Sequence, residues 1–265
     1  MNTQKVHLNK GWMEVYDFGN RKLHAYQTND LMTDESYILE NKDQILLLEF
    51  PAFYDNLGEF EQYVSSLEKP IIAKVFSDHP NGATIFSDCK AYASKGTLQS
   101  MQTGTIYHLV EGFKTAFHGE FASEFHTITD ILEGSKVTIG DFDLEITYHE
   151  EDIEIVFPQL QVVYTHMLGH DCHSIVTSNT HADAIIHQLE TYKQKGYVLI
   201  LSSHHTPETL EDVDTKIAYL KDIKEIASHT SNKETFIKVI ESKYPTYQGL
   251  NYLEMTATAF FPEKA

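Results

Sequence analysis

The segment from Ile45 to Gly82 constrains the fold more than any other part of the sequence. It begins with the continuous apolar run Ile45–Phe50, which is typical of a strand buried on both faces of a sheet. Residues Phe53–Leu67 then have the apolar spacing of a helix that packs one side against a sheet. A second apolar strand, Pro70–Phe76, ends in the polar loop Ser77–Gly82. This order predicts an α/β layer with a functional loop at the carboxyl end of a strand.

The rest of the chain contains too many strand pairs for one parallel sheet. Alternating strands over Lys22–Gln27 and Glu35–Glu40 precede the first buried strand. Two later strands flank the turn at Gly140–Asp141, and two more meet at Pro158. Hairpins of this frequency predict an α+β fold, an αβ/βα four-layer sandwich in which two mixed sheets pack face to face with helices outside.

Helical patterns occupy much of the second half. Residues Thr97–Gly119 are predicted to be helical, and His181–Lys195 forms a clear helix that stops at Gly196. The sequence after residue 208 is charged and mostly helical. We therefore expect the sandwich to span residues 1–208, with a helical C-terminal extension, residues 209–265, that packs on the same domain and is available for a homodimer contact.

Histidine is frequent, at 15 of 265 residues, and it gathers where predicted strands end. These strand-end histidines are His79, His149, His166, His170, His173, His204 and His205. Neutral imidazole is the commonest protein ligand of zinc and other transition metals, and Asp78 beside His79 adds an oxygen ligand. The pattern therefore indicates a metal site at one rim of the sheets.

The order of elements and loops resembles the metallo-β-lactamase superfamily. In that family an acidic residue ends a strand before a helix, where this chain has Leu47-Leu48-Glu49-Phe50-Pro51. The next family strand ends in His-x-His-x-Asp-His, where this chain has Lys74-Val75-Phe76-Ser77-Asp78-His79. The Asp-His pair is kept, and Lys74 and Phe76 replace the two leading histidines. The resemblance extends over about residues 22–208 and implies a metal-dependent hydrolase.

The resemblance also implies which metal ligands remain. One family site loses two of its three ligands, and Lys74 places an ammonium group about where its cation would lie. The other site keeps Asp78, His79 and His204. We therefore expect one divalent metal, zinc, with iron or manganese as alternatives. The candidate ligands are Asp78, His79, His149, His166, His170 and His204.

The spacing of His166, His170 and His173 permits a further hypothesis. The three side chains would share one face of a helix, with Asp171 as a fourth possible ligand beside them. His166, His170 and the pair Asp78–His79 could then form a relocated metal site. The alternative is that Gly169-His170-Asp171 is a turn in which Asp171 caps the following segment.

Two functions from different classes follow. The first is hydrolysis of a small ester, lactone, thioester or amide, with Asp78 orienting a water molecule or acting as general base and Lys74 stabilising an oxyanion or binding an anionic group of the substrate. The second is a catalytically inactive member of the fold that binds a ligand or a partner in the same cleft.

The composition disfavours several classes of binding partner. The 20 basic and 39 acidic residues give a net charge of −19, which disfavours nucleic acids and anionic membrane surfaces. No apolar stretch has the length of a signal peptide core or a membrane span. Two cysteines, Cys89 and Cys172, do not form a disulfide framework. We expect a cytoplasmic protein that acts on a small molecule.

Overall fold

The computed structural model describes residues 2–167 and 169–262. The chain forms two compact units. Unit 1 comprises Met1–Met167 and Leu201–Pro207, and unit 2 comprises Leu168–Ile200 and Glu208–Ala265. The domain boundary expected between residues 208 and 209 stays a prediction.

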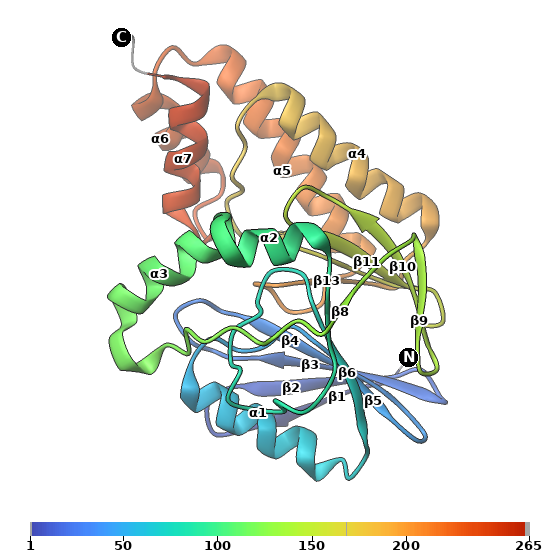
Figure 1. Ribbon diagram of the computed structural model, residues 1–265. Coiled ribbons are helices and arrows are strands. Elements are labelled where there is room, and N and C mark those ends of the chain that lie inside the picture. The colour runs from blue at the N-terminus through green and yellow to red at the C-terminus, as the bar shows by residue number, and fades with distance from the viewer. Residues whose placement is uncertain (1, 168, 263–265) are drawn as a thin grey trace. The chain divides into compact units, whose positions relative to one another are not determined.

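Unit 1 contains an eight-stranded sheet in which the strands lie in chain order (Figure 1). The strands are β1 (Asn2–His7), β2 (Trp12–Asp17), β3 (Arg21–Gln27), β4 (Glu35–Asn41), β5 (Ile45–Leu48), β6 (Ile71–Phe76), β7 (Ala91–Ala93) and β8 (Asp130–Ile131). Strands β1 to β5 pair antiparallel and β5 to β8 pair parallel, so the sheet is mixed. The sequence patterns did not predict the hairpin formed by β1 and β2.

The second sheet has the order β13-β12-β11-β10-β9. Its strands are β9 (Lys136–Ile139), β10 (Phe142–Tyr148), β11 (Ile153–Phe157), β12 (Val162–Thr165) and β13 (Leu199–Ser202). In unit 1 it packs face to face with the first sheet. The rings of Tyr37 and Tyr164 lie 6.1 Å apart, and the Tyr37 hydroxyl donates to the carbonyl of Ser202 at 2.6 Å. These contacts confirm the predicted two-sheet sandwich.

Helix α1 (Tyr54–Ser66) covers the other face of the first sheet, as its apolar spacing predicted. It buries Leu57, Phe60 and Val64 in a cluster that also contains Tyr26 and Phe76. Burial of side chains of this size stabilises the fold by roughly 1.5–3 kcal/mol each. The cluster fixes β6, and with it the position of the loop that follows β6.

The helix predicted over Thr97–Gly119 is two helices, α2 (Lys95–Thr103) and α3 (Thr105–Phe117), followed by a short 3-10 turn, η1 (His118–Glu120). Gly104 separates α2 from α3 with an extended backbone. A β-carbon there would lie 2.6 Å from the Ser100 Cα, so only glycine fits this close approach. Helical spacing alone did not reveal the break.

Unit 2 contains α4 (Asn179–Lys195), α5 (Leu210–His229), α6 (Lys233–Lys243) and α7 (Leu250–Phe260). Helix α4 ends at Gly196 in the left-handed conformation, at φ 67°, as predicted. Helix α5 begins with a capping box between Thr209 and Asp212. Buried Lys216 on α5 donates to the carbonyls of Gly169 and Cys172 at 2.7 and 2.9 Å.

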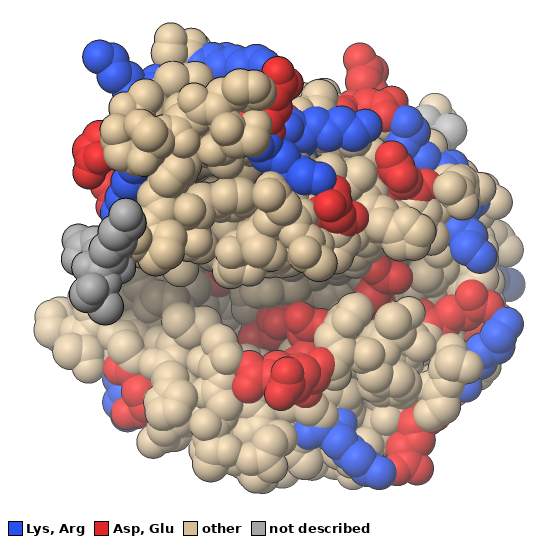
Figure 2. All heavy atoms as spheres, turned by 90° about the horizontal axis from the view of Figure 1, so that it is seen from above, with Lys and Arg blue, Asp and Glu red and all other residues tan. Residues whose placement is uncertain are grey.

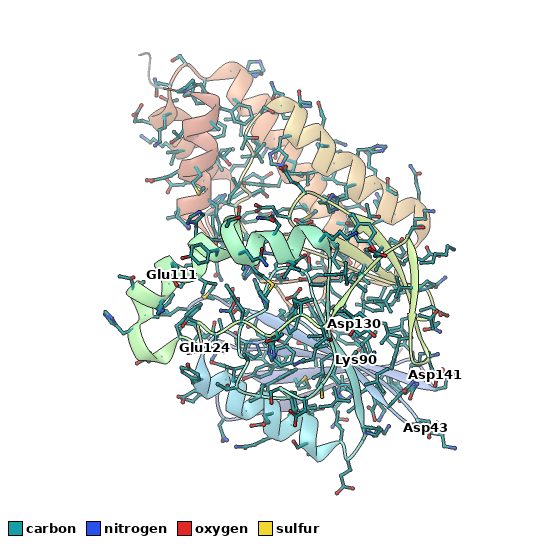
Figure 3. All side chains as sticks on the ribbon, viewed as in Figure 1. Asp43, Lys90, Glu111, Glu124, Asp130 and Asp141 are labelled. Atoms are coloured by element: carbon teal, nitrogen blue, oxygen red, sulfur yellow. The ribbon has the colours of Figure 1, made fainter. Side chains whose placement is uncertain are left out.

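Charged side chains are spread over the surface. On the face shown in Figure 2, acidic groups are scattered with lysine and arginine between them. Figure 3 shows Asp43 and Asp141, which lie on turns at the ends of the strands remote from the β6 loop, and Lys90, which pairs with Asp130 at 3.7 Å. None of the described helices is long and apolar enough to cross a membrane.

Candidate metal centre

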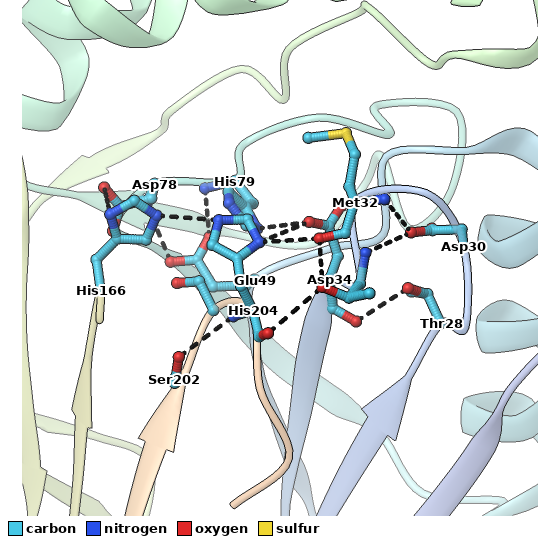
Figure 4. Close-up of polar contacts among 12 residues, drawn as sticks. Thr28, Asp30, Met32, Asp34, Glu49, Asp78, His79, His166, Ser202 and His204 are labelled. Carbon is cyan, nitrogen blue, oxygen red and sulfur yellow. Dashed lines mark hydrogen bonds and ion pairs between the residues drawn. The ribbon is translucent and has the colours of Figure 1, made fainter. Parts of the chain in front are cut away.

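Three of the predicted histidines come together in unit 1. His79 lies in the loop after β6, His166 directly follows β12, and His204 follows β13 (Figure 4). One ligand nitrogen from each lies within 4.8 Å of the other two. The strands of both sheets therefore bring His79, His166 and His204 to one rim, and we call these three residues the histidine cluster.

The spacing within the histidine cluster fits a metal ion. The Nε2 atoms of His166 and His204 are 3.3 Å apart, and the ring centres of His79 and His204 are 4.8 Å apart. A tetrahedral zinc ion with Zn–N bonds of about 2.0–2.1 Å places two ligand nitrogens about 3.3–3.4 Å apart. The nitrogen pair thus has the separation that one shared ion requires.

Protonation favours metal binding by two of the three rings. Burial lowers the pKa of His79 to about 3, and burial together with the charge of His204 lowers the pKa of His166 to about 4. Both rings are therefore neutral at pH 7 and each carries a free lone pair. Burial also lowers the pKa of His204, but the hydrogen bond and charge of Asp34 outweigh it, so the net shift is upward.

Asp34 is a member of the site that sequence reasoning missed. Its carboxylate is fully buried, and Oδ1 lies 3.2 Å from His204 Nδ1 and 3.9 Å from His79 Nδ1. Burial raises the pKa of Asp34, but the neighbouring histidines, His79 first, outweigh burial and hold this pKa below its usual value. The only signal in the sequence was a polar loop with two aspartates between two alternating strands.

Asp78 lies beside the histidine cluster. Its Oδ2 accepts a hydrogen bond from the Ser77 hydroxyl at 2.6 Å, and its Oδ1 is 3.7 Å from His166 Nδ1. Burial raises the pKa of the Asp78 carboxyl. The structure thus brings Asp78 to His166, while the group of mutually close ligand atoms contains the three histidines.

Glu49, the acidic residue that ends the first buried strand, anchors the loop that carries His79. Its carboxylate accepts backbone N–H groups from Ser77, Asp78 and His79 at 2.6, 3.1 and 2.6 Å. The Tyr164 hydroxyl donates to the same carboxylate at 3.0 Å. Four donors on one buried carboxylate hold the loop in place, which explains why the Asp78–His79 pair has a defined position.

Lys74 and Phe76, at the two positions where the motif His-x-His-x-Asp-His has its leading histidines, lie in the core. Phe76 is fully buried, with ring centres 5.4 Å from Phe50 and 5.0 Å from His126. Lys74 donates to the Phe86 carbonyl at 2.8 Å and faces His126 Nδ1 at 3.0 Å. We call Lys74, Phe76 and His126 the lysine core. His126 carried no sequence signal, because its partners are distant in the chain.

The remaining predicted histidines lie elsewhere. His149 is half exposed, with Nε2 4.0 Å from Asp152 Oδ1, and it lines a surface depression with Lys95 and Tyr148. In unit 2, His170 Nδ1 lies 2.7 Å from the Glu208 carboxylate.

The proposed helical face of His166, His170 and His173 is wrong, because the described residues between 166 and 178 form no helix. Their backbone makes turns and isolated contacts instead, and residues 169–172 close a turn through the Cys172 N–H to the Gly169 carbonyl at 3.2 Å. His173 is buried in unit 2 against the Tyr219 hydroxyl at 3.0 Å.

Comparisons with known proteins show which solved structures have a similar fold. No family model matches the chain. No curated protein matches it either. Among solved structures, the chain resembles the stereoselective inverting sec-alkylsulfatase Pisa1 from Pseudomonas sp. with a TM-score of 0.59 and 16% identity. The match covers 89% of this chain and 48% of the sulfatase chain, so the chain spans about half of the sulfatase's length.

Two metallo-β-lactamases also match the chain. The enzyme from Pontibacter korlensis has a TM-score of 0.49 and 12% identity, over 83% of this chain and 100% of the other. DIM-1 has a TM-score of 0.49 and 11% identity, over 79% of this chain and 97% of the other. The sequence motifs agree with the two paired sheets and with the fold shared with the sulfatase. They also agree with the rim that carries Asp78, His79, His166 and His204. The chain has the metallo-β-lactamase fold.

Proposed function

We propose that the protein is a metal-dependent hydrolase of a small ester, lactone, thioester or amide. The observation that carries the proposal is the histidine cluster, because its ligand nitrogens lie within 4.8 Å of one another at the rim where two sheets end. The neighbours of known structure, a sulfatase and two β-lactamases, are consistent with hydrolysis.

The donor set favours one zinc ion. His79, His166 and His204 supply three imidazole nitrogens, the ligand type that zinc shares with iron and copper, and three protein ligands leave a position for water or substrate. Iron or manganese is the alternative if a carboxylate joins the set. The bound metal would lower the pKa of a water molecule and polarise the bond to be cleaved.

Asp78 is the residue we assign to proton transfer. Its Oδ1 lies 3.7 Å from His166, and Ser77 holds its other oxygen. Burial brings the pKa of Asp78 up toward neutrality, where a carboxyl group can both accept and return a proton at Oδ1. Lys74 has no role in the proposed reaction, because its ammonium group is buried and bonded to Phe86 and His126.

One observation favours a second candidate. The positions of two family ligands, Lys74 and Phe76, are part of the packed core. A protein that keeps one metal and binds a ligand without turning it over would show the same structure. Turnover separates the two candidates.

The first experiment measures metal and activity together. Protein purified without added metal and then given zinc is expected to hold about one ion per chain by elemental analysis. His204→Ala is expected to weaken zinc binding by at least about 100-fold, since loss of a supporting residue alone commonly weakens it 10–100-fold. His108→Ala, at an exposed histidine on α3, is the matched control and should bind as the wild type does.

A panel of esters, lactones, thioesters and amides then tests catalysis. Hydrolysis that is lost on chelation and restored by zinc supports the proposed enzyme. Metal binding without turnover of any panel member favours the binding protein. A wild-type protein that binds no zinc, iron or manganese contradicts both versions of the metal centre.

A further inference from the structure

Asp34 reaches the histidine cluster on a loop with its own internal support. Residues 28–34 join β3 to β4, and Asp30 Oδ1 accepts the N–H groups of Met32 and Thr33, both at 2.9 Å. The Thr28 hydroxyl donates to the Asp34 carbonyl at 3.1 Å. These bonds close the loop on itself, so the backbone at Asp34 has a defined position before any ligand binds.

The same segment is bonded to the backbone beside His204. The Glu35 N–H donates to the Ser203 carbonyl at 2.8 Å, and the Thr33 hydroxyl oxygen, which donates to the Met32 carbonyl at 2.7 Å, lies 3.4 Å from the His204 carbonyl. His204 Nδ1 also lies 3.3 Å from the Met32 carbonyl. The Glu35–Ser203 bond therefore holds the backbone at Asp34 close to His204, and this proximity does not depend on the Asp34 carboxylate.

The Asp34 carboxylate still lacks well-aligned donors. Both of its oxygens are buried, and among the described residues no group donates a well-aligned hydrogen bond to either. The ring nitrogens that face it are His204 Nδ1 at 3.2 Å and His79 Nδ1 at 3.9 Å. A buried carboxylate in this state is costly unless it is paired, so its function must lie with these rings.

The chemistry of metal-bound imidazole suggests what the Asp34 carboxylate does. A histidine that binds a metal through one nitrogen usually donates the other N–H to a carboxylate, which fixes the tautomer and the ring orientation. His204 has this arrangement: Nδ1 faces both the Asp34 carboxylate at 3.2 Å and the Met32 carbonyl at 3.3 Å, and Nε2 faces His166 Nε2 at 3.3 Å. Asp34 itself is outside the group of mutually close ligand atoms.

We propose that Asp34 is a positioning residue that accepts the Nδ1–H of His204 and thereby presents the His204 Nε2 lone pair to the metal. The inference rests on the proposed metal site. It differs from the role of Asp78, whose carboxylate already accepts the Ser77 hydroxyl and lies beside His166.

The test uses Asp34→Asn, with Asp30→Asn as the matched control. Both variants remove one carboxylate charge from the same loop. Asp30 accepts backbone N–H groups, which an asparagine oxygen accepts equally, and among the described residues it forms no ion pair with the histidine cluster. Zinc affinity is measured by competition with a chelator, and circular dichroism confirms that each variant is folded. Asp34→Asn should bind zinc about 10–100-fold more weakly, and Asp30→Asn should stay within about threefold of the wild type.

A second measurement reports on the ring without metal. Long-range proton–nitrogen NMR spectra of the metal-free wild type at about pH 8 should show His204 protonated at Nδ1. In Asp34→Asn only neutral acceptors, the Met32 carbonyl at 3.3 Å and the asparagine oxygen, face His204 Nδ1, so the fraction of the Nε2–H tautomer should rise. A merely structural effect would not produce this change. An Nε2–H tautomer in the folded wild type would overturn the inference even if Asp34→Asn did not fold.

The two proposals fail in different ways. A wild-type protein that binds no zinc overturns the proposed function. Wild-type zinc affinity in folded Asp34→Asn, with His204 still protonated at Nδ1, overturns only the role of Asp34.

Discussion

The histidine cluster and the lysine core lie next to the same strand, β6, and have opposite chemistry. In the histidine cluster, ring nitrogens face one another across 3.3 Å and a buried carboxylate lacks well-aligned donors. In the lysine core, Lys74 has two hydrogen-bond partners and Phe76 is packed between aromatic rings. Strand β6 thus separates a packed interior, in which the Lys74 ammonium group is bonded to protein, from a rim where imidazole nitrogens lie close enough to share an ion.

The largest effect is expected from the double variant Lys74→His, Phe76→His, which places two histidines in the lysine core. We expect the free energy of unfolding to fall by about 3–5 kcal/mol, because aromatic packing and the Lys74 hydrogen bonds are lost. Denaturant titration measures the loss, and elemental analysis should still give about one metal per chain. A second bound ion in the folded variant would show that the lysine core can reopen as a metal site.

Glu49→Gln tests whether the loop anchor maintains the histidine cluster. Glutamine keeps one acceptor oxygen and brings an NH2 group against the N–H donors of Ser77, Asp78 and His79. We expect a loss of about 1–3 kcal/mol in unfolding free energy and zinc affinity weakened about tenfold.

The matched control for Glu49→Gln is Glu59→Gln. Glu59 also accepts three backbone N–H groups, from Asn9, Lys10 and Gly11, but it anchors the β1–β2 hairpin. We expect Glu59→Gln to lower the free energy of unfolding by about as much as Glu49→Gln does, with no change in zinc affinity. Equal zinc affinities in Glu49→Gln and the wild type would separate the loop anchor from the site.

His126→Phe tests the lysine core through the pH dependence of the free energy of unfolding. Burial, and then the charge of Lys74, lower the pKa of His126 to about 3. Below its ordinary pKa of about 6.5, the unfolded chain takes up a proton that the folded chain does not, so stability is full above pH 6.5 and falls toward pH 3. The slope contributed by this residue is at most about 1.4 kcal/mol per pH unit.

Urea unfolding of metal-free protein at pH 7, 6 and 5 measures that slope. The stability of His126→Phe should fall less steeply than that of the wild type. His108→Phe, at an exposed position, should keep the wild-type slope. Parallel curves for the wild type and His126→Phe would contradict a buried neutral imidazole.

Local patterns predicted the parts of the fold that depend on local physics. The buried strand, helix and strand of residues 45–76 were correct because apolar spacing reports directly on burial. The same rule located the strand ends that carry His79, His166 and His204. The break at Gly104 was missed because it depends on close contact with Ser100, which spacing does not report.

The site was predicted less completely than the fold. Asp34 and His204 are 170 residues apart, and His126 meets Lys74 across 52, so no spacing rule connects either pair. The helical ligand set of His166, His170 and His173 was wrong because three residues at helical spacing do not make a helix without a surrounding apolar stripe. Contacts between distant segments require the sheet topology.

The bond from the Glu35 N–H to the Ser203 carbonyl limits where insertions in the β3–β4 loop can be tolerated in evolution. It fixes Asp34 from the β4 side, and the bonds from Thr28 to the Asp34 carbonyl fix it from the β3 side. Insertions at residues 29–32 would break the Asp30 bonds but leave both of these anchors, and each doubling of loop length would cost only about 0.6 kcal/mol in loop closure. One residue inserted between Asp34 and Glu35 would move the carboxylate away from His204. The β3–β4 loop can thus vary in length before Asp34, whereas no residue can be inserted between Asp34 and β4 without moving the carboxylate.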